Sequence, residues 1–145
     1  MKYSLVTLLL IGLAACNNGQ KSSTAELSDK MPKLVFVDKG VYDFGQVTEG
    51  DTVVRNFAFK NEGQFPLIIN NIHTSCGCTT PEWPKKPIEP GAESAIKVKF
   101  NSAGKRGVQN KTVTVYANTD PAYSEITFRV MVNPRPESNQ TAATQ

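Results

Sequence analysis

The stretch Ile96-Lys97-Val98-Lys99-Phe100-Asn101 alternates apolar and polar side chains at every position. A period of two places the apolar side chains on one face of an extended strand and the polar side chains on the other. The same alternation returns over 112–116 and over 126–131. Each of these stretches is therefore predicted to be a strand with one buried and one solvated face, as in an antiparallel sheet.

Short β-rich stretches continue on both sides, from Leu34 to Asn133, and none shows apolar residues at helical spacing over three turns. Glycines and prolines such as Gly45 and Pro90-Gly91 mark the predicted turns. The sequence thus predicts an all-β fold, an immunoglobulin-like antiparallel sandwich of about seven strands. The predicted strands cover 34–37, 41–44, 52–60, 67–73, 93–101, 109–118 and 125–133.

The start of the chain predicts export and lipidation. Lys2 precedes an apolar run over 5–13, which is too short to span a bilayer permanently and is typical of a signal peptide. The run ends in Leu13-Ala14-Ala15-Cys16, which is similar to the lipobox cut before a diacylglyceryl-modified cysteine. We therefore expect a bacterial lipoprotein with a signal peptide over 1–15 and a lipid on Cys16. The alternative is an ordinary signal peptide, or a buried apolar helix, with an incidental cysteine.

Lipidation would place the protein in the cell envelope, with the membrane as a partner through the anchor. Asn17 is not the aspartate that resembles an inner-membrane retention signal in some bacteria. The outer membrane is therefore favoured over the inner one, with the domain facing the periplasm. The sixteen basic residues exceed the thirteen acidic ones by little and are scattered, which argues against nucleic acid as a partner. No cofactor is expected beyond the lipid.

Composition divides the chain after the signal peptide. Residues 16–32 are rich in Asn, Gln, Ser, Thr and charge, which predicts a flexible lipidated tether. Residues 33–134 contain all the predicted strands and predict one immunoglobulin-like domain of ordinary size. The polar segment 135–145 has no periodic pattern and is predicted to be a disordered tail.

A family resemblance lies in Thr74-Ser75-Cys76-Gly77-Cys78-Thr79-Thr80-Pro81, followed by Ile88-Glu89-Pro90-Gly91 and by 111–118. Together these segments resemble the domain-of-unknown-function family 1573. The resemblance implies an exported bacterial protein, often a lipoprotein, with a domain similar to the immunoglobulin-like sandwiches of the major-sperm-protein type. It implies no reaction, so hypotheses about function depend on individual residues.

Cys76 and Cys78 are the most distinctive chemical feature of the predicted domain. In an exported protein a lone pair predicts a disulfide, here a local staple, with Gly77 able to adopt the backbone angles of a small ring. A second hypothesis is a Cu or Zn site of His73 with both cysteines, because imidazole and thiolate suit these metals. A third is thiol-disulfide exchange, although no helix is predicted to activate a thiol.

Trp83 lies between Pro81 and Pro84, in a segment too rich in proline for a central strand. It is predicted to pack over the edge of the sandwich as a lid. The alternative is an exposed aromatic contact for an envelope protein or a glycan, since aromatic side chains are favoured at binding hot spots.

Signatures of catalysis are missing from the sequence. It has no nucleophile elbow and no phosphate-binding glycine motif, and carboxylates such as Asp43 and Glu82 are spread along the chain and expected to be solvated. No catalytic residue is assigned and an enzyme is not expected. The leading hypothesis is a membrane-anchored module that binds or scaffolds another envelope component. The alternative is a metal-binding or thiol-disulfide protein that uses His73 and Cys76-Gly77-Cys78.

Overall fold

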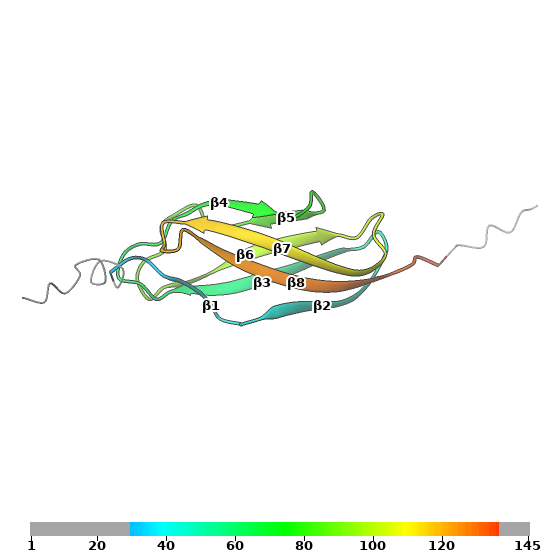
Figure 1. Ribbon diagram of the computed structural model, residues 1–145, viewed down its shortest axis with the longest axis horizontal. Coiled ribbons are helices and arrows are strands. Elements are labelled where there is room, and N and C mark those ends of the chain that lie inside the picture. Colours follow the sequence, from blue (N-terminus) through cyan, green and yellow to red (C-terminus); the bar gives the residue numbers. More distant parts are fainter. Residues whose placement is uncertain (1–29, 137–145) are drawn as a thin grey trace, which may run out of the picture.

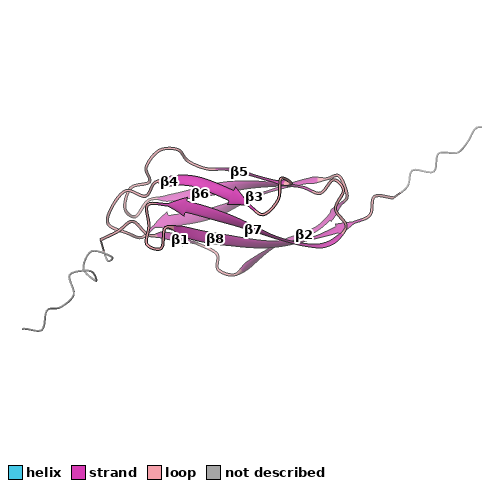
Figure 2. Cartoon of the chain, turned by 45° about the horizontal axis from the view of Figure 1, so that its top comes forward, coloured by secondary structure: helices cyan, strands magenta, loops and turns pink. Residues whose placement is uncertain are grey.

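Eight strands form two four-stranded sheets that pack face to face (Figure 1). The computed structural model describes residues 30–136, and in that range it contains strands, turns and loops but no helix (Figure 2). The first sheet has the order β1 (Leu34–Phe36), β3 (Thr52–Asn61), β6 (Glu93–Asn101) and β5 (Thr79–Glu82). The second has the order β2 (Val41–Thr48), β8 (Tyr123–Asn133), β7 (Gly107–Ala117) and β4 (Ile69–Thr74).

This arrangement confirms the predicted all-β immunoglobulin-like sandwich. Immunoglobulin constant-type domains place four strands in one sheet and three in the other. Here the second sheet gains β2, which runs parallel to β8 at its edge, whereas all other neighbouring strands are antiparallel. Residues 30–136 contain no helix that is long and apolar enough to cross a membrane.

The core lies between the sheets and uses the alternation that the sequence shows. Ile96, Val98 and Phe100 of β6 point inward and are fully buried. Across the core, the Phe100 ring meets the Phe128 ring edge-on, and within the second sheet Phe44 stacks on Phe128 with ring centroids 4.2 Å apart. The largest fully buried side chains are Phe57, Phe59, Phe100, Phe128, Leu67, Ile96 and Ile126, with Val98, Val113, Val115, Val130 and Val132.

Two differences from the predicted strands go beyond shifts of one or two residues at strand ends. Gly45 does not end β2 in a turn, because its φ of 75° forms a bulge and the strand continues to Thr48. The pairing with β8 changes register between Asp43 and Gln46 at this bulge. β5 was not predicted, since it is short and contains Pro81. It lies at the edge of its sheet, where proline is tolerated because no neighbour needs its missing N–H group.

The folded contacts extend slightly past the predicted limits of 33 and 134. Pro32 is buried, and Arg135 donates from Nε to the carbonyl oxygen of Glu49 at 2.9 Å. The predicted signal peptide over 1–15 and the lipidation site at Cys16 lie outside the described residues, as do most of the predicted tether and tail.

Candidate functional site

Cys76 and Cys78 lie in the connection between β4 and β5, where the chain crosses from one sheet to the other. In the structure their sulfur atoms are bonded to each other, and their Cα atoms are 5.2 Å apart. Both residues are partly exposed. We call residues 75–78 the disulfide corner. The redox state of this pair in the exported protein stays a prediction.

Backbone hydrogen bonds fix the disulfide corner to both sheets. The Ser75 N–H donates to the Thr112 carbonyl of β7 at 3.0 Å, and the Thr112 N–H donates back to Ser75 Oγ at 3.1 Å. On the other side, the Asn101 N–H at the end of β6 donates to the Cys78 carbonyl at 2.9 Å. The shape of the corner therefore depends on these bonds as well as on the disulfide.

Gly77 does not have the role that the sequence suggested. Its φ lies outside the left-handed region, and a Cβ atom added to it would meet no atom within 4 Å. The ring closed by Cys76 and Cys78 therefore does not require glycine at position 77. The expectation that Gly77 supplies special backbone freedom is wrong.

His73 lies on β4, opposite Thr114 of β7, and its side chain is exposed. The Cu or Zn hypothesis needs this imidazole together with two thiolates. In the structure the sulfur atoms of Cys76 and Cys78 are used by their mutual bond. Over residues 30–136 no group of three or more His, Cys, Asp or Glu side chains is placed to hold a metal ion. The metal hypothesis thus applies only to the reduced protein and stays a prediction.

Trp83 follows β5 and is partly buried against the core. Its Nε1 atom is buried without a hydrogen-bond partner among the described residues. The Lys85 ammonium group lies 3.1 Å from the centroid of the indole ring, a cation–π contact that covers one ring face. This placement supports a packing role for Trp83 over a role as an exposed aromatic contact.

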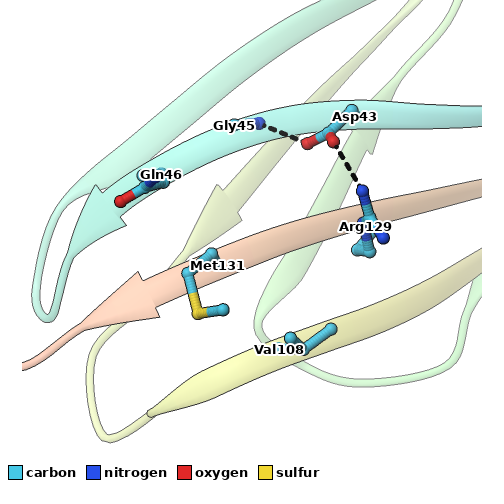
Figure 3. A pocket seen from close by; sticks show the side chains of 6 residues that line it. All are labelled: Asp43, Gly45, Gln46, Val108, Arg129 and Met131. Atoms are coloured by element: carbon cyan, nitrogen blue, oxygen red, sulfur yellow. Dashed lines mark hydrogen bonds and ion pairs between the residues drawn. The ribbon is translucent and has the colours of Figure 1, made fainter.

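A recess on the outer face of the second sheet was missed by the sequence analysis (Figure 3). It has a volume of about 350 Å³ and spans three neighbouring strands. The bulge at Gly45 shifts β2 against β8 at this point. We call it the Asp43–Arg129 recess, and it is lined by Asp43, Gly45 and Gln46 of β2, Arg129 and Met131 of β8, and Val108 of β7.

An ion pair lies in the Asp43–Arg129 recess. Arg129 Nη2 donates to Asp43 Oδ2 at 2.9 Å, and the Gly45 N–H donates to Asp43 Oδ1 at 2.7 Å (Figure 3). The hydrogen bond from Arg129, together with that from Gly45, lowers the pKa of the Asp43 carboxyl below its usual range. Each of the two charged side chains is 57% exposed. Beside them, the apolar side chains of Val108 and Met131 are also exposed.

The signals for this recess in the sequence were weak. The sequence predicts a solvated role for the Asp43 carboxylate and does not predict its ion pair with Arg129 across β2 and β8. Gly45 interrupts an otherwise alternating stretch, and an isolated glycine in a strand is a known signal for a bulge. The sequence pattern does not predict that Asp43 lies beside Arg129. The two residues meet through the parallel pairing of β2 with β8, which come from the two ends of the domain.

Comparisons with known proteins agree with the fold. The family model described as "Protein of unknown function (DUF1573)" matches residues 35–132. No curated protein matches the chain.

Solved structures show the same architecture at low sequence identity. A protein of unknown function from Porphyromonas gingivalis W83 has a TM-score of 0.61 and 15% identity over 72% of this chain, which spans 48% of that chain. The ASH / PapD-like domain 7 of human CEP192 has a TM-score of 0.52 and 9% identity, over 93% of this chain and 98% of that one. The secreted serine protease VesC from Vibrio cholerae has a TM-score of 0.53 and 14% identity over 74% of this chain, which spans 24% of VesC. These likenesses show the fold alone.

Proposed function

Since the chain belongs to the DUF1573 family of proteins of unknown function, we propose that it is a binding or scaffolding module of the bacterial cell envelope. In this proposal a lipid on Cys16 anchors the protein to a membrane, and the outer membrane is favoured over the inner one. The domain faces the periplasm and binds another envelope component. It has no catalytic activity of its own.

The proposed anchor rests on the lipobox-like residues before Cys16. Each buried CH₂ group of an acyl chain stabilises membrane binding by roughly 0.8 kcal/mol. One chain alone binds marginally, whereas the two or three chains of a processed lipoprotein hold firmly. The lipid would thus retain the domain at the membrane and leave its surfaces available to a partner.

The observation that carries the binding proposal is the Asp43–Arg129 recess. Within the described part of the chain, the Arg129 guanidinium donates to Asp43 alone, which leaves most of its five N–H donors for a ligand. The neighbouring side chains of Val108 and Met131 offer apolar surface to the same ligand. A guanidinium group beside apolar surface suits a partner segment that presents a carboxylate next to apolar side chains.

The recess and the disulfide corner belong to one outer surface. In the β7–β8 ladder Arg129 pairs with Asn110. Two residues along, Thr127 pairs with Thr112, and the side chains of this pair lie on the same outer face of the sheet. Thr112 is hydrogen bonded to Ser75 of the disulfide corner. A partner segment that crosses the strands from the recess would therefore meet polar side chains up to the corner.

The chemistry of the recess supports binding better than catalysis. None of its six lining residues is a serine, cysteine or histidine, so it has no side chain of the kind that most often serves as nucleophile or general base. Its one carboxylate is already paired with Arg129.

Site-specific photo-crosslinking in intact cells tests the proposal. A photo-reactive amino acid at Val108 reports on the recess, and the same residue at Val54, exposed on the other sheet, is the matched control. We expect a defined crosslinked product from Val108 that is absent from Val54 and is reduced about tenfold or more by Arg129→Ala, since a hydrogen bond to a charged group contributes roughly 1.5–3 kcal/mol. Equal products from both positions, or none from Val108, would contradict it.

Thiol-disulfide exchange is the second candidate, and the partial exposure of Cys76 and Cys78 favours it. In this reaction a client thiolate attacks one sulfur atom and the other leaves as a thiolate, which gives a mixed disulfide. Trapping with Cys76→Ser and Cys78→Ser single variants tests it. A mixed disulfide with one client in cells supports exchange, whereas the absence of any trapped client in both variants excludes it.

A further inference from the structure

Exposed apolar side chains gather at one end of the sandwich. Five large apolar side chains there are between 39% and 54% exposed, and their grouping is more informative than the exposure of any one of them. They come from the segment before β1, the β3–β4 connection, and the two ends of strands that meet at the β7–β8 turn. We call this set the apolar end, and it consists of Met31, Phe65, Ile68, Tyr116 and Tyr123.

Contacts between the segments show that these side chains share one end. A Cβ atom on Gly63 would lie 2.2 Å from the Met31 carbonyl oxygen, so the chain before β1 passes directly over the β3–β4 connection. Ile68 donates its N–H group to Asn118 Oδ1 at 2.8 Å, which joins that connection to the end of β7. Tyr116 and Tyr123 are cross-strand partners with ring centroids 6.5 Å apart.

A buried side chain holds the apolar end in shape. Asn61 is fully buried, and its Nδ2 atom donates to the carbonyl oxygens of Phe65 at 2.8 Å and Ile88 at 2.9 Å. Its Oδ1 atom accepts the N–H groups of Gly63 at 3.0 Å and Lys33 at 3.2 Å. Because one buried amide satisfies four backbone groups, the loop that presents Phe65 is fixed rather than adaptable.

The chain enters the domain at the same end. The segment before β1 lies at the apolar end, whereas the segment after β8 leaves the sandwich at the opposite end (Figure 1). Cys16 precedes residue 30 by fourteen residues, since 30 − 16 = 14. Fourteen residues reach at most about 50 Å when fully extended. An anchor on Cys16 therefore keeps the apolar end within a few tens of ångströms of the bilayer.

Weak surface affinity is enough at such short range. Tyrosine side chains are enriched at membrane–water interfaces, because the ring is apolar while the hydroxyl group stays wet. Tethering makes contact with the bilayer effectively intramolecular, so a small patch of Phe, Ile and Tyr suffices to orient the domain.

We propose that the apolar end rests on the bilayer surface and orients the domain, an inference that rests on the proposed lipid anchor at Cys16. The side chains of Phe65, Ile68 and Tyr123 enter the lipid headgroup region. Val108 pairs with Met131 at the far end of the same β7–β8 ladder, eight residues from Tyr116, which is about 26 Å at the rise of a strand. The Asp43–Arg129 recess thereby lies in the half of the domain that is farther from the membrane, where a partner can reach it.

Tryptophan quenching by lipid tests this orientation. The full lipidated chain is placed in vesicles of phosphatidylethanolamine and phosphatidylglycerol that contain dibrominated phosphatidylcholine, which quenches indole on contact. Phe65→Trp reports on the apolar end, and Val108→Trp is its control, because the two native side chains are 54% and 52% exposed. The wild-type chain gives the baseline from Trp83.

We expect the brominated lipid to remove most of the emission added by Phe65→Trp and little of that added by Val108→Trp. Equal quenching of both, or quenching of neither in protein that floats with the vesicles, would overturn the proposed orientation and leave the anchor intact. If the emission from Phe65→Trp changes only with the ratio of protein to lipid on the vesicles, a second copy of the chain covers the apolar end. This result would also overturn the proposed orientation. Protein that does not float with the vesicles would overturn the anchor together with the orientation.

Discussion

Asp43 and Arg129 are 86 positions apart in the chain, yet Arg129 Nη2 donates to Asp43 Oδ2 at 2.9 Å. The contact exists because β2 pairs in parallel with β8, so that Asp43 lies directly beside Arg129 in the sheet. The bulge at Gly45 turns the backbone so that its N–H group donates to the same carboxylate. One acidic and one basic side chain are thus held side by side at the opening of a recess.

The titration of Asp43 checks this relationship. Its pKa is lowered mainly by the hydrogen bond from Arg129, so the carboxyl titrates below the ordinary value of about 3.9. Any stability that the pair contributes is present above the unfolded pKa and is lost as the pH falls through the lower folded pKa. We expect Arg129→Ala to raise the pKa of Asp43, measured from its carboxyl carbon shift by NMR. An unchanged titration would show that the pair does not persist in solution.

Gly63 provides a test of the packing at the apolar end. Its missing Cβ leaves room for the backbone of Met31, Pro32 and Lys33, which would lie 2.2 to 2.5 Å from an added atom. We expect Gly63→Ala to destabilise the domain by about 1–3 kcal/mol or more, since backbone cannot move aside as a side chain can. Thermal unfolding measures this. Gly77→Ala is the control, because its Cβ meets nothing within 4 Å, and an equal loss in both variants would contradict the packing described.

Much of the fold was predictable, because it depends on local alternation. The inward residues of β6 could be assigned from the sequence, since their period of two matches the burial of Ile96, Val98 and Phe100. β5 could not be assigned, because Thr79–Glu82 is short, contains a proline and becomes a strand only by pairing with β6. That pairing is a tertiary contact that local sequence does not encode.

The candidate site was less predictable than the fold. Cys76 and Cys78 are two positions apart, so they are a local signal that the sequence shows directly. The recess depends on the pairing of β2 with β8 and on the bulge at Gly45. The local sequence pattern predicts neither the partner strand of β2 nor the register of the pairing. The packing of Trp83, by contrast, was predictable from its segment between Pro81 and Pro84, and the side chain is partly buried against the core.

The disulfide corner is expected to contain a Cys76–Cys78 bond in the exported protein. In the chain-entropy model a bridge that closes a fifteen-residue loop contributes roughly 3 kcal/mol, and a shorter loop contributes less. Cys76→Ser with Cys78→Ser should therefore leave the domain folded, with a modest drop in melting temperature and greater protease sensitivity between His73 and Trp83. Mass spectrometry of the unreduced peptide should show the loss of two hydrogen atoms. Free thiols in protein shielded from reductant would contradict the bond and favour the metal hypothesis.

The anchor is tested by Cys16→Ala. Without a thiol at this position no diacylglyceryl group can be attached, so we expect the variant to be soluble or unprocessed rather than held at a membrane. Cell fractionation with a high-salt wash measures this. Ser22→Ala, in the same predicted tether, should fractionate like the wild type. A Cys16→Ala protein that stays with washed membranes would show that the lipoprotein prediction is wrong.

The central claim is that the Asp43–Arg129 recess binds an envelope component, and a charge swap tests it most directly. Asp43→Arg combined with Arg129→Asp keeps an ion pair across β2 and β8 but exchanges the positions of the two charges. Both side chains are largely exposed, so the melting temperature should change little. The measurement is the yield of the Val108 photo-crosslink in intact cells. We predict that the yield falls about tenfold or more, as expected when a charged hydrogen bond is lost, whereas an unchanged yield in the folded double variant would contradict the claim.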